Sequence, residues 1–208
     1  MPSPTFFHLP QAKRDRLLQC ARDEFSRVSF DEASINRIVR QAEIARGSFY
    51  MYFTDKEDLF RYLLQCYLDE LTQMLQTLLD REQGDLFAAF SALFQTLVEQ
   101  RDSPSAQQFH AILHRNAGVQ QGALLRSAST HTLFSALSGH IDRTRLSLRR
   151  EEDLEDMFHI LISVTAPALC AALSHTDPQI AWARLQAQLD ILRRGMEARE
   201  APAAFHHE

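Results

Sequence analysis

Helix-breaking residues are scarce in this chain, which has only 6 glycines and 7 prolines among its 208 residues. So few breakers leave little material for the many sharp turns of a sheet-rich fold. Leu, Ala, Gln and Arg, which favour helices, are abundant by contrast. The composition therefore predicts an all-α protein.

Cysteine is scarce as well. Cys20, Cys66 and Cys170 lie far apart and form no CxxC pair, so the pattern does not suggest a disulfide framework. We interpret them as thiols in a reducing cytoplasm. The sequence also lacks an apolar run long enough to span a membrane, and its N-terminus lacks the pattern of a signal peptide. We therefore expect a soluble cytoplasmic protein with no membrane partner.

No excess of positive charge marks a nucleic-acid partner, because the net charge is −5. Residues 1–60 hold nine basic and nine acidic side chains, whereas the remainder holds 13 basic and 18 acidic side chains. The N-terminal part is thus neutral, and the rest of the chain carries the whole negative charge. If DNA is the partner, the placement of a few charges must matter more than their sum.

No arrangement typical of an enzyme is visible either. The sequence has neither a Ser/His/Asp set nor a glutamate-x-x-histidine repeat, so we expect no catalytic residues and no cofactor. His110 and His114 have a spacing that suits a metal, but the sequence places no third ligand. Cys66 leaves an oxidant-sensing role open, although nothing nearby would lower its pKa. A redox- or metal-responsive function is therefore an alternative.

The spacing of apolar residues predicts helices near the N-terminus. One covers 11–27, with Leu17 and Phe25 on the same face. Two shorter helices follow over about 34–41 and 45–51, and about three residues join them. This is the spacing of a helix-turn-helix.

A capping box predicts where the next helix begins, with Thr54 as the cap and Glu57 reaching back. No breaker follows before Gly84, so we expect one long connecting helix over 55–81. Further helices are predicted over 85–101, 104–115, 123–148, 151–175 and 178–198. We therefore expect a helix-turn-helix domain over 1–54, a helical domain over 55–200 and a flexible tail over 201–208.

The segment from Ser34 to Leu59 resembles the DNA-binding signature of the TetR/AcrR family of transcription regulators, and the likeness covers about residues 11–60. The matching residues are Ala21, Phe25, Ile38, Ala42, Gly47, Ser48, Phe49, Tyr50, Tyr52, Phe53, Lys56, Glu57 and Leu59. The resemblance implies a ligand-responsive repressor that binds a palindromic DNA operator as a homodimer. It also implies a C-terminal helical domain for effector binding and dimerisation.

The residue types in this segment suit contact with DNA. A helix enters the major groove when its outer face is small or polar and its inner face is anchored, here by Phe49. Gly47 permits close approach of the backbone, and Arg46 can pair with a guanine edge or a phosphate. Hydroxyl groups and a lysine at a helix N-terminus suit phosphates. The expected DNA-contacting residues are Ser34, Arg37, Ala45, Arg46, Gly47, Ser48, Tyr50, Tyr52 and Lys56.

Three residues depart from the family pattern. Glu43 stands in the turn where glycine is usual, which implies backbone strain and an acid near DNA. Val39 replaces a smaller alanine. Ala45 replaces a serine or threonine and so removes a helix cap and a phosphate donor. A helical interaction protein with impaired DNA binding is therefore a second alternative.

Two apolar stripes in the C-terminal part predict a dimer interface, although a simple core explains the same stripes, and small residues in the first stripe allow helices to approach closely. The expected interface residues are Leu161, Ala168, Ala172, Trp182, Leu185, Leu189 and Leu192. An aromatic-rich set can line a cavity for a small apolar effector, although a packed core explains the same pattern. That set is Phe87, Phe90, Phe94, Phe109, Leu113, Phe134 and Phe158.

Overall fold

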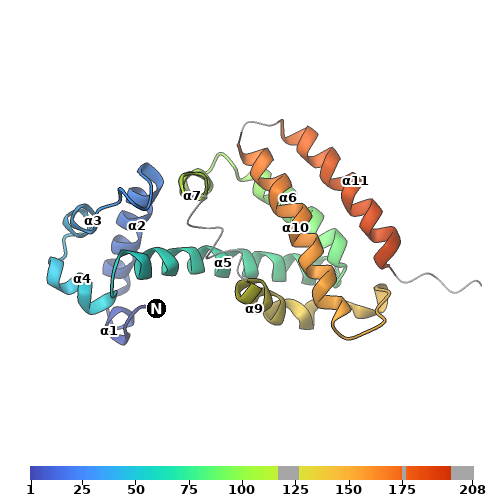
Figure 1. The fold of residues 1–208 in the computed structure, drawn as a ribbon, viewed down its shortest axis with the longest axis horizontal. Coiled ribbons are helices and arrows are strands. Elements are labelled where there is room, and N and C mark those ends of the chain that lie inside the picture. The colour runs from blue at the N-terminus through green and yellow to red at the C-terminus, as the bar shows by residue number, and fades with distance from the viewer. Residues whose placement is uncertain (117–126, 175–176, 198–208) are drawn as a thin grey trace, which may run out of the picture. The chain divides into compact units, whose positions relative to one another are not determined.

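A computed structural model describes residues 1–116, 127–174 and 177–197 of the chain. These residues form helices and, apart from one isolated β-bridge between Leu146 and Glu197, no strand pairing. The all-α prediction is therefore confirmed (Figure 1), whereas the tail expected over 201–208 lies outside the described residues. The α-helices are α1 (Pro4–Phe7), α2 (Gln11–Arg27), α3 (Ile35–Gln41), α4 (Arg46–Tyr52), α5 (Lys56–Arg81), α6 (Leu86–Glu99), α7 (Pro104–Arg115), α9 (Ser127–Leu137), α10 (Asp153–Leu173) and α11 (Pro178–Met196).

The chain divides into two compact units. The first comprises Met1–Gln73 and Glu99–Leu133, and the second comprises Met74–Val98 and Phe134–Glu208. Helix α5 runs through both units. The boundary expected after residue 54 stays a prediction, and in this division the first part of α5 and Ile112 of α7 bury apolar side chains in the N-terminal core.

The core of the first unit lies where α2, α3, α4 and the first part of α5 meet. Phe25, Ile38, Phe49 and Phe53 are almost fully buried there, and such aromatic burial is a large stabilising contribution. Helices α3 and α4 have seven residues each. Helices this short are unstable alone, so the shared core sets their geometry.

Helix α7 packs against α2 within the same unit. The ring of Phe109 lies with its centroid 4.3 Å from that of Tyr67 on α5. Directly after α7, the buried Asn116 accepts a hydrogen bond from the backbone N–H of Phe30 at 2.6 Å. Its amide nitrogen donates to the carbonyl of Ile112 at 2.8 Å. Asn116 thus joins the C-terminal end of α7 to the loop between α2 and α3.

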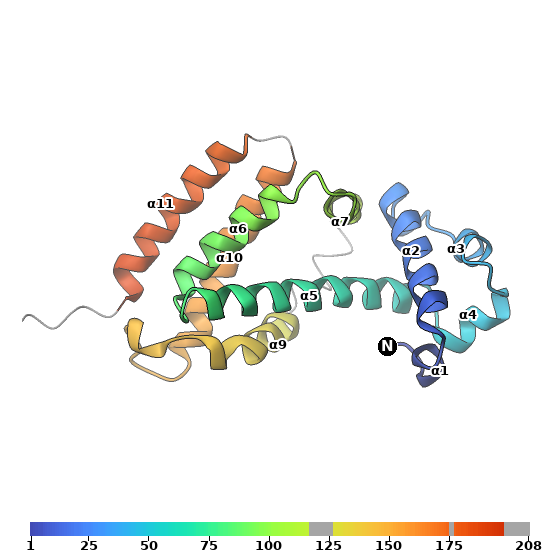
Figure 2. The same ribbon diagram turned by 180° about the vertical axis from the view of Figure 1, so that it is seen from behind.

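The second unit is built around α10 and α11, which lie side by side (Figures 1 and 2). Helix α6 adds aromatic side chains to this core. Phe90 packs on Phe158 with ring centroids 5.6 Å apart, and Phe94 stacks on Trp182 at 5.4 Å. Most of the helices expected from periodicity are therefore present and packed through their apolar faces.

Two local expectations need correction. The capping box of α5 is shifted by one residue, because Asp55 accepts from the N–H of Asp58 at 2.8 Å and Asp58 accepts from the N–H of Thr54 at 3.1 Å. Glu57 pairs with Arg61 at 2.7 Å instead. The helix expected over 123–148 ends at Leu137, and two 3₁₀ turns, η1 (Ser138–His140) and η2 (Arg143–Arg145), follow it. Its expected start at 123–126 lies outside the described residues.

Candidate DNA-binding site

The outer face of α4 is exposed and its inner face is anchored. Phe49 is fully buried, whereas Tyr50 and Met51 are 50% and 59% exposed. Arg46 and Gly47 at the start of the helix are exposed as well. A Cβ atom added to Gly47 would have no neighbour within 4 Å, so another molecule can approach the backbone here. This is the surface that a helix needs to enter the major groove.

The other residues expected around α4 differ in accessibility. Ala45 is exposed and forms the N-cap of α4 without a side-chain hydrogen bond. Ser48 is half-buried. The side chain of Tyr52 is largely buried, and its ring packs near that of Phe6 with centroids 6.3 Å apart. A phosphate contact by Tyr52 would therefore involve only the end of the side chain.

The turn between α3 and α4 has a left-handed residue at its centre. Glu43 adopts φ 56°, a conformation that costs free energy for a residue with a Cβ. The N–H of Ile44 bonds the carbonyl of Val39 at 3.0 Å, and that of Glu43 bonds Arg40 at 3.3 Å. This pair of bonds is a Schellman motif. The turn thus keeps the geometry that glycine usually supplies.

The acid in this turn has a partner on α2. Arg16 forms a salt bridge with Glu43 at 2.6 Å and donates to the carbonyl of Gln41 at 3.4 Å. The hydrogen bond from Arg16 lowers the pKa of Glu43, so the carboxylate is charged at neutral pH. The pair offsets the negative charge that the sequence places beside α4.

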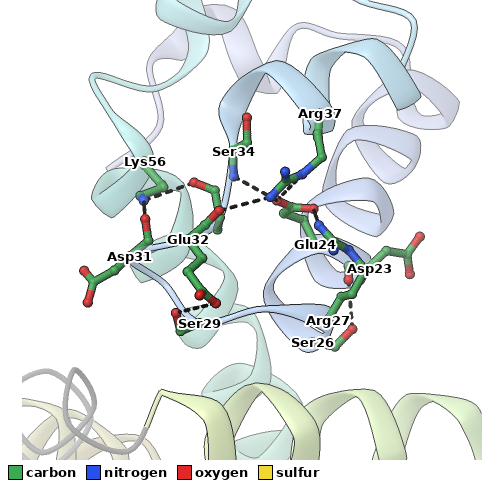
Figure 3. Close-up of polar contacts among 11 residues, drawn as sticks. Asp23, Glu24, Ser26, Arg27, Ser29, Asp31, Glu32, Ser34, Arg37 and Lys56 are labelled. Atoms are coloured by element: carbon green, nitrogen blue, oxygen red, sulfur yellow. Dashed lines mark hydrogen bonds and ion pairs between the residues drawn. The ribbon is translucent and has the colours of Figure 1, made fainter.

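A buried carboxylate organises the start of α3 (Figure 3). Glu24 on α2 is 2% exposed. It accepts hydrogen bonds from the N–H of Ser34 and Nε of Arg37, each at 2.8 Å, and from Arg27 at 2.7 Å. Burial alone would raise the pKa of Glu24, but these hydrogen bonds outweigh burial and lower the pKa from 4.5 to about 2. Glu24 therefore holds Ser34, the N-cap residue of α3, as a carboxylate.

Two residues expected to contact phosphates, Arg37 and Lys56, bind groups of the protein itself. Arg37 binds Glu24 and also donates to the carbonyl of Glu32 at 3.0 Å. Lys56 donates to the carbonyls of Asp31 and Ala33, both at 3.1 Å (Figure 3), and its ammonium lies 4.6 Å from the ring centroid of Phe30. Both side chains therefore hold the loop between α2 and α3. An ammonium has three N–H groups, so Lys56 keeps one for a phosphate.

Several residues of this site were missed by the sequence reasoning. Glu24 and Arg16 act through tertiary contacts, which no local motif reveals. Met51 lies on the outer face of α4, and its exposure follows only from the orientation that Phe49 gives the helix. Arg40 is exposed, and among the described residues neither Arg40 nor Arg46 has an acidic partner. These two guanidinium groups are therefore the cations of α3 and α4 that are free for DNA.

The expected interface residues of the second unit are mostly core residues. Leu161, Ala172, Leu185 and Leu189 are buried within the single chain, whereas Ala168, Trp182 and Leu192 are half-buried. These four side chains already belong to the core of the single chain, so the expected interface stays a prediction. The exposed face of α10 instead presents Ile160, Ser163, Pro167, Cys170 and Ser174, and that of α11 presents Ile180, Arg184, Ala187, Ile191 and Arg194.

The structure does not bring the expected effector-lining residues into one unit. Phe109 and Leu113 lie on α7 in the first unit. Phe134 and Phe158 belong to the second unit, where their ring centroids are 5.7 Å apart. The remaining members, Phe87, Phe90 and Phe94, are buried on α6. An effector cavity stays a prediction, and within the second unit its lining would come from the phenylalanines of α6, α9 and α10.

Comparison with known proteins identifies two matching family descriptions. Residues 17–63 match "Bacterial regulatory proteins, tetR family", and residues 85–196 match "Tetracyclin repressor-like, C-terminal domain". Over 151 residues the chain is 33% identical to the HTH-type transcriptional regulator YdgC of Bacillus subtilis, covering 62% of this chain and 77% of that protein. It is 31% identical over 110 residues to the HTH-type transcriptional repressor KstR2 of Mycolicibacterium smegmatis, covering 53% and 48%.

Solved structures share the fold at lower identity. A tetR-family transcriptional regulator from Pectobacterium atrosepticum has a TM-score of 0.64 at 21% identity, covering 93% of this chain and 100% of that one. SmeT, the repressor of a Stenotrophomonas maltophilia multidrug efflux pump, has a TM-score of 0.63 at 15% identity, covering 95% and 97%. The matched C-terminal domain alone spans more than half of the sequence. The chain therefore belongs to the tetR family of bacterial regulatory proteins, which are DNA-binding regulators of transcription.

Proposed function

We propose that this regulator is a dimeric, ligand-responsive repressor in the cytoplasm, and that it binds a near-palindromic operator with α4 in the major groove. The observation that carries the proposal is the outer face of α4. There Arg46, Tyr50 and Met51 are exposed around an open Gly47, while Phe49 anchors the helix from behind. An arginine can read a guanine edge, and an apolar side chain can contact a thymine methyl group.

A binding titration tests this assignment. The protein first selects duplexes from a randomised pool, and fluorescence anisotropy then compares the selected duplex with an unrelated duplex at several salt concentrations. We expect Arg46→Ala to weaken binding to the selected duplex about 10- to 100-fold, as loss of a bidentate base contact does. Arg61→Ala removes the same charge from α5 and serves as the control. No selection by the wild-type protein, or equal losses for both variants, would contradict the assignment.

We further propose that Arg40, Ser34 and the remaining N–H of Lys56 contact phosphates. Phosphate contacts carry no base information, so their loss weakens binding to all duplexes alike. Arg40→Ala is therefore expected to reduce affinity equally for the selected and the unrelated duplex, and to reduce the slope of log K against log salt by about one. A loss confined to the selected duplex would instead assign Arg40 to base contact.

The exposed faces of α10 and α11 support a dimer. Contrary to the expectation from the sequence, helix α10 is long and apolar enough to cross a membrane by length and composition alone, and only 28% of its most apolar window is buried in the single chain. One exposed stripe of α10 and its C-cap has intervals of three and four, with Ile160, Ser163, Pro167, Cys170 and Ser174. One exposed stripe of α11 has the same intervals, with Ile180, Arg184, Ala187, Ile191 and Arg194. This spacing suits packing of helix against helix. A second copy of the chain would cover both stripes in a four-helix bundle.

The aromatic core of the second unit offers an apolar lining for a small molecule. A ligand entering beside α6 would disturb the stacking of Phe94 on Trp182, whose rings are 5.4 Å apart. Trp182 is the only tryptophan in the sequence, so its fluorescence reports on this contact. We expect an effector to change that emission and to weaken operator binding over the same concentration range.

A further inference from the structure

We propose that the segment from Ser3 to Phe6 is a positioning element that holds the C-terminal end of the recognition helix α4. The backbone N–H of Ser3 donates to the carbonyl of Tyr52 at 2.9 Å, and the Ser3 hydroxyl donates to the carbonyl of Met51. Met51 and Tyr52 are the last two residues of α4. Carbonyls at a helix C-terminus have no partner within the helix, so Ser3 supplies two bonds that α4 cannot make itself.

Phe6 fixes this segment in place. The residue is fully buried, and its ring centroid lies 5.0 Å from that of Phe53 and 5.4 Å from that of Tyr62. Helix α1 thereby packs at the junction where α4 ends and α5 begins, beside α4 (Figure 1). A buried aromatic ring contributes far more stability than an exposed one. The bonds from Ser3 are thus made by an anchored segment.

This clamp acts on the residues that face DNA. Helix α4 has seven residues, and its N-cap Ala45 makes no side-chain hydrogen bond, so the helix has little stability of its own. Tyr50 and Met51, both exposed, lie in its last turn. The direction of that turn decides which base edges they reach. Ser3 and Phe6 therefore position the reading face without contacting DNA.

A set of small substitutions tests the proposal, which rests on the DNA-binding function. Ser3→Ala removes only the hydroxyl, and Ser3→Thr restores it. Phe6→Leu shortens the buried side chain, and Phe7→Leu makes the same change at a neighbour that is half-exposed. Affinity is measured for a duplex selected by the wild-type protein from a randomised pool and for an unrelated duplex, well below the melting temperature of each variant. Amide hydrogen exchange of α4 is measured without DNA.

We expect Ser3→Ala and Phe6→Leu to weaken binding to the selected duplex about three- to tenfold, as loss of one hydrogen bond or a little buried apolar volume does. Affinity for the unrelated duplex should stay within about twofold, since phosphate contacts remain. Exchange should become faster in α4 before it does in α2. Ser3→Thr and Phe7→Leu should behave as the wild type.

Equal losses for both duplexes, or no loss for either, would overturn the proposal and leave the segment as part of the core only. Unchanged exchange in α4 would overturn it as well. If the wild-type protein selected no duplex, the proposed function would fail, while hydrogen exchange would still decide whether Ser3 and Phe6 hold α4.

Discussion

The two compact units present their functional surfaces in opposite ways. In the first unit, exposed polar residues on α3 and α4 are held from behind by buried groups, among them Glu24 and Phe49. In the second unit, the buried faces of α10 and α11 form an ordinary apolar core. Their opposite faces expose apolar residues, with Ile160 and Ile191 at 40% and 63% exposure, and this exposure indicates a partner. The proposed DNA-binding surface is thus recognised by the buried groups that hold its helices in place. The proposed dimer surface is recognised by exposed apolar residues that the single chain does not cover.

The largest expected effect is on the dimer. Ile191→Asp replaces an apolar side chain by a carboxylate in the middle of the exposed α11 stripe, so apolar contact is lost and the carboxylate must be desolvated in the interface. We expect the dimer dissociation constant to rise by about 100-fold or more. Sedimentation velocity over a range of protein concentrations measures this. Gln186→Asp, an exposed position on α11 outside the stripe, is the control, and equal effects of both variants would refute the proposed interface.

The next largest effect concerns the buried carboxylate of Glu24, which holds the N-terminal end of α3. Glu24→Gln keeps the shape of the side chain but removes the charge that Arg37, Arg27 and the Ser34 N–H share. We expect the free energy of unfolding to fall by about 2–3 kcal/mol at pH 7. Chemical denaturation measures it. Glu32→Gln, at an exposed acid in the same loop, should change stability by less than about 0.5 kcal/mol.

The pH dependence of this effect has a defined sign. The pKa of Glu24 is about 2 in the folded protein and 4.5 ordinarily, so its charge stabilises the fold fully above pH 4.5. That stabilisation is lost as the pH falls through the folded pKa. The difference between the wild type and Glu24→Gln should therefore shrink below pH 4.5 and vanish near pH 2. A difference that stays constant down to pH 3 would show that the charge of Glu24 is not its cause.

A smaller effect is expected where α7 meets the loop after α2. Asn116→Ala leaves the N–H of Phe30 without its acceptor in a partly buried setting, and such a loss costs about 1–2 kcal/mol. Gln108→Ala removes an exposed hydrogen bond to Asp23 from the same helix and should cost less than about 0.5 kcal/mol. Thermal unfolding compares the two. Equal small losses would mean that α7 is only loosely joined to the helix-turn-helix.

The sequence predicted the first unit better than the second for a physical reason. A helix-turn-helix is short, and its capping, turn and anchor residues, such as Phe49 and Gly47, lie close together in the chain, so a local pattern describes it. Glu24 and Asn116 act across 10 and 86 positions in sequence, which no periodicity reveals. In the second unit, the apolar stripes of α10 and α11 were recognised, but Leu161 and Leu185 are fully buried within the single chain. Periodicity gives the direction of a stripe and not the identity of what covers it.

The smallest expected effect is at the turn between α3 and α4, where the sequence reasoning and the structure agree on backbone strain. Glu43→Gly removes a residue with φ 56° that glycine adopts without steric cost, and it frees Arg16 from its salt bridge. We expect a slightly higher melting temperature and a gain in affinity for DNA of about two- to fivefold, with a salt slope steeper by up to about one. Glu43→Asn, which tolerates the same backbone conformation without the charge, separates the two causes. If Asn reproduces the affinity gain but not the thermal one, charge governs DNA binding and strain governs stability. Unchanged affinity in both variants would mean that the pair of Glu43 with Arg16 lies beyond the reach of the phosphates.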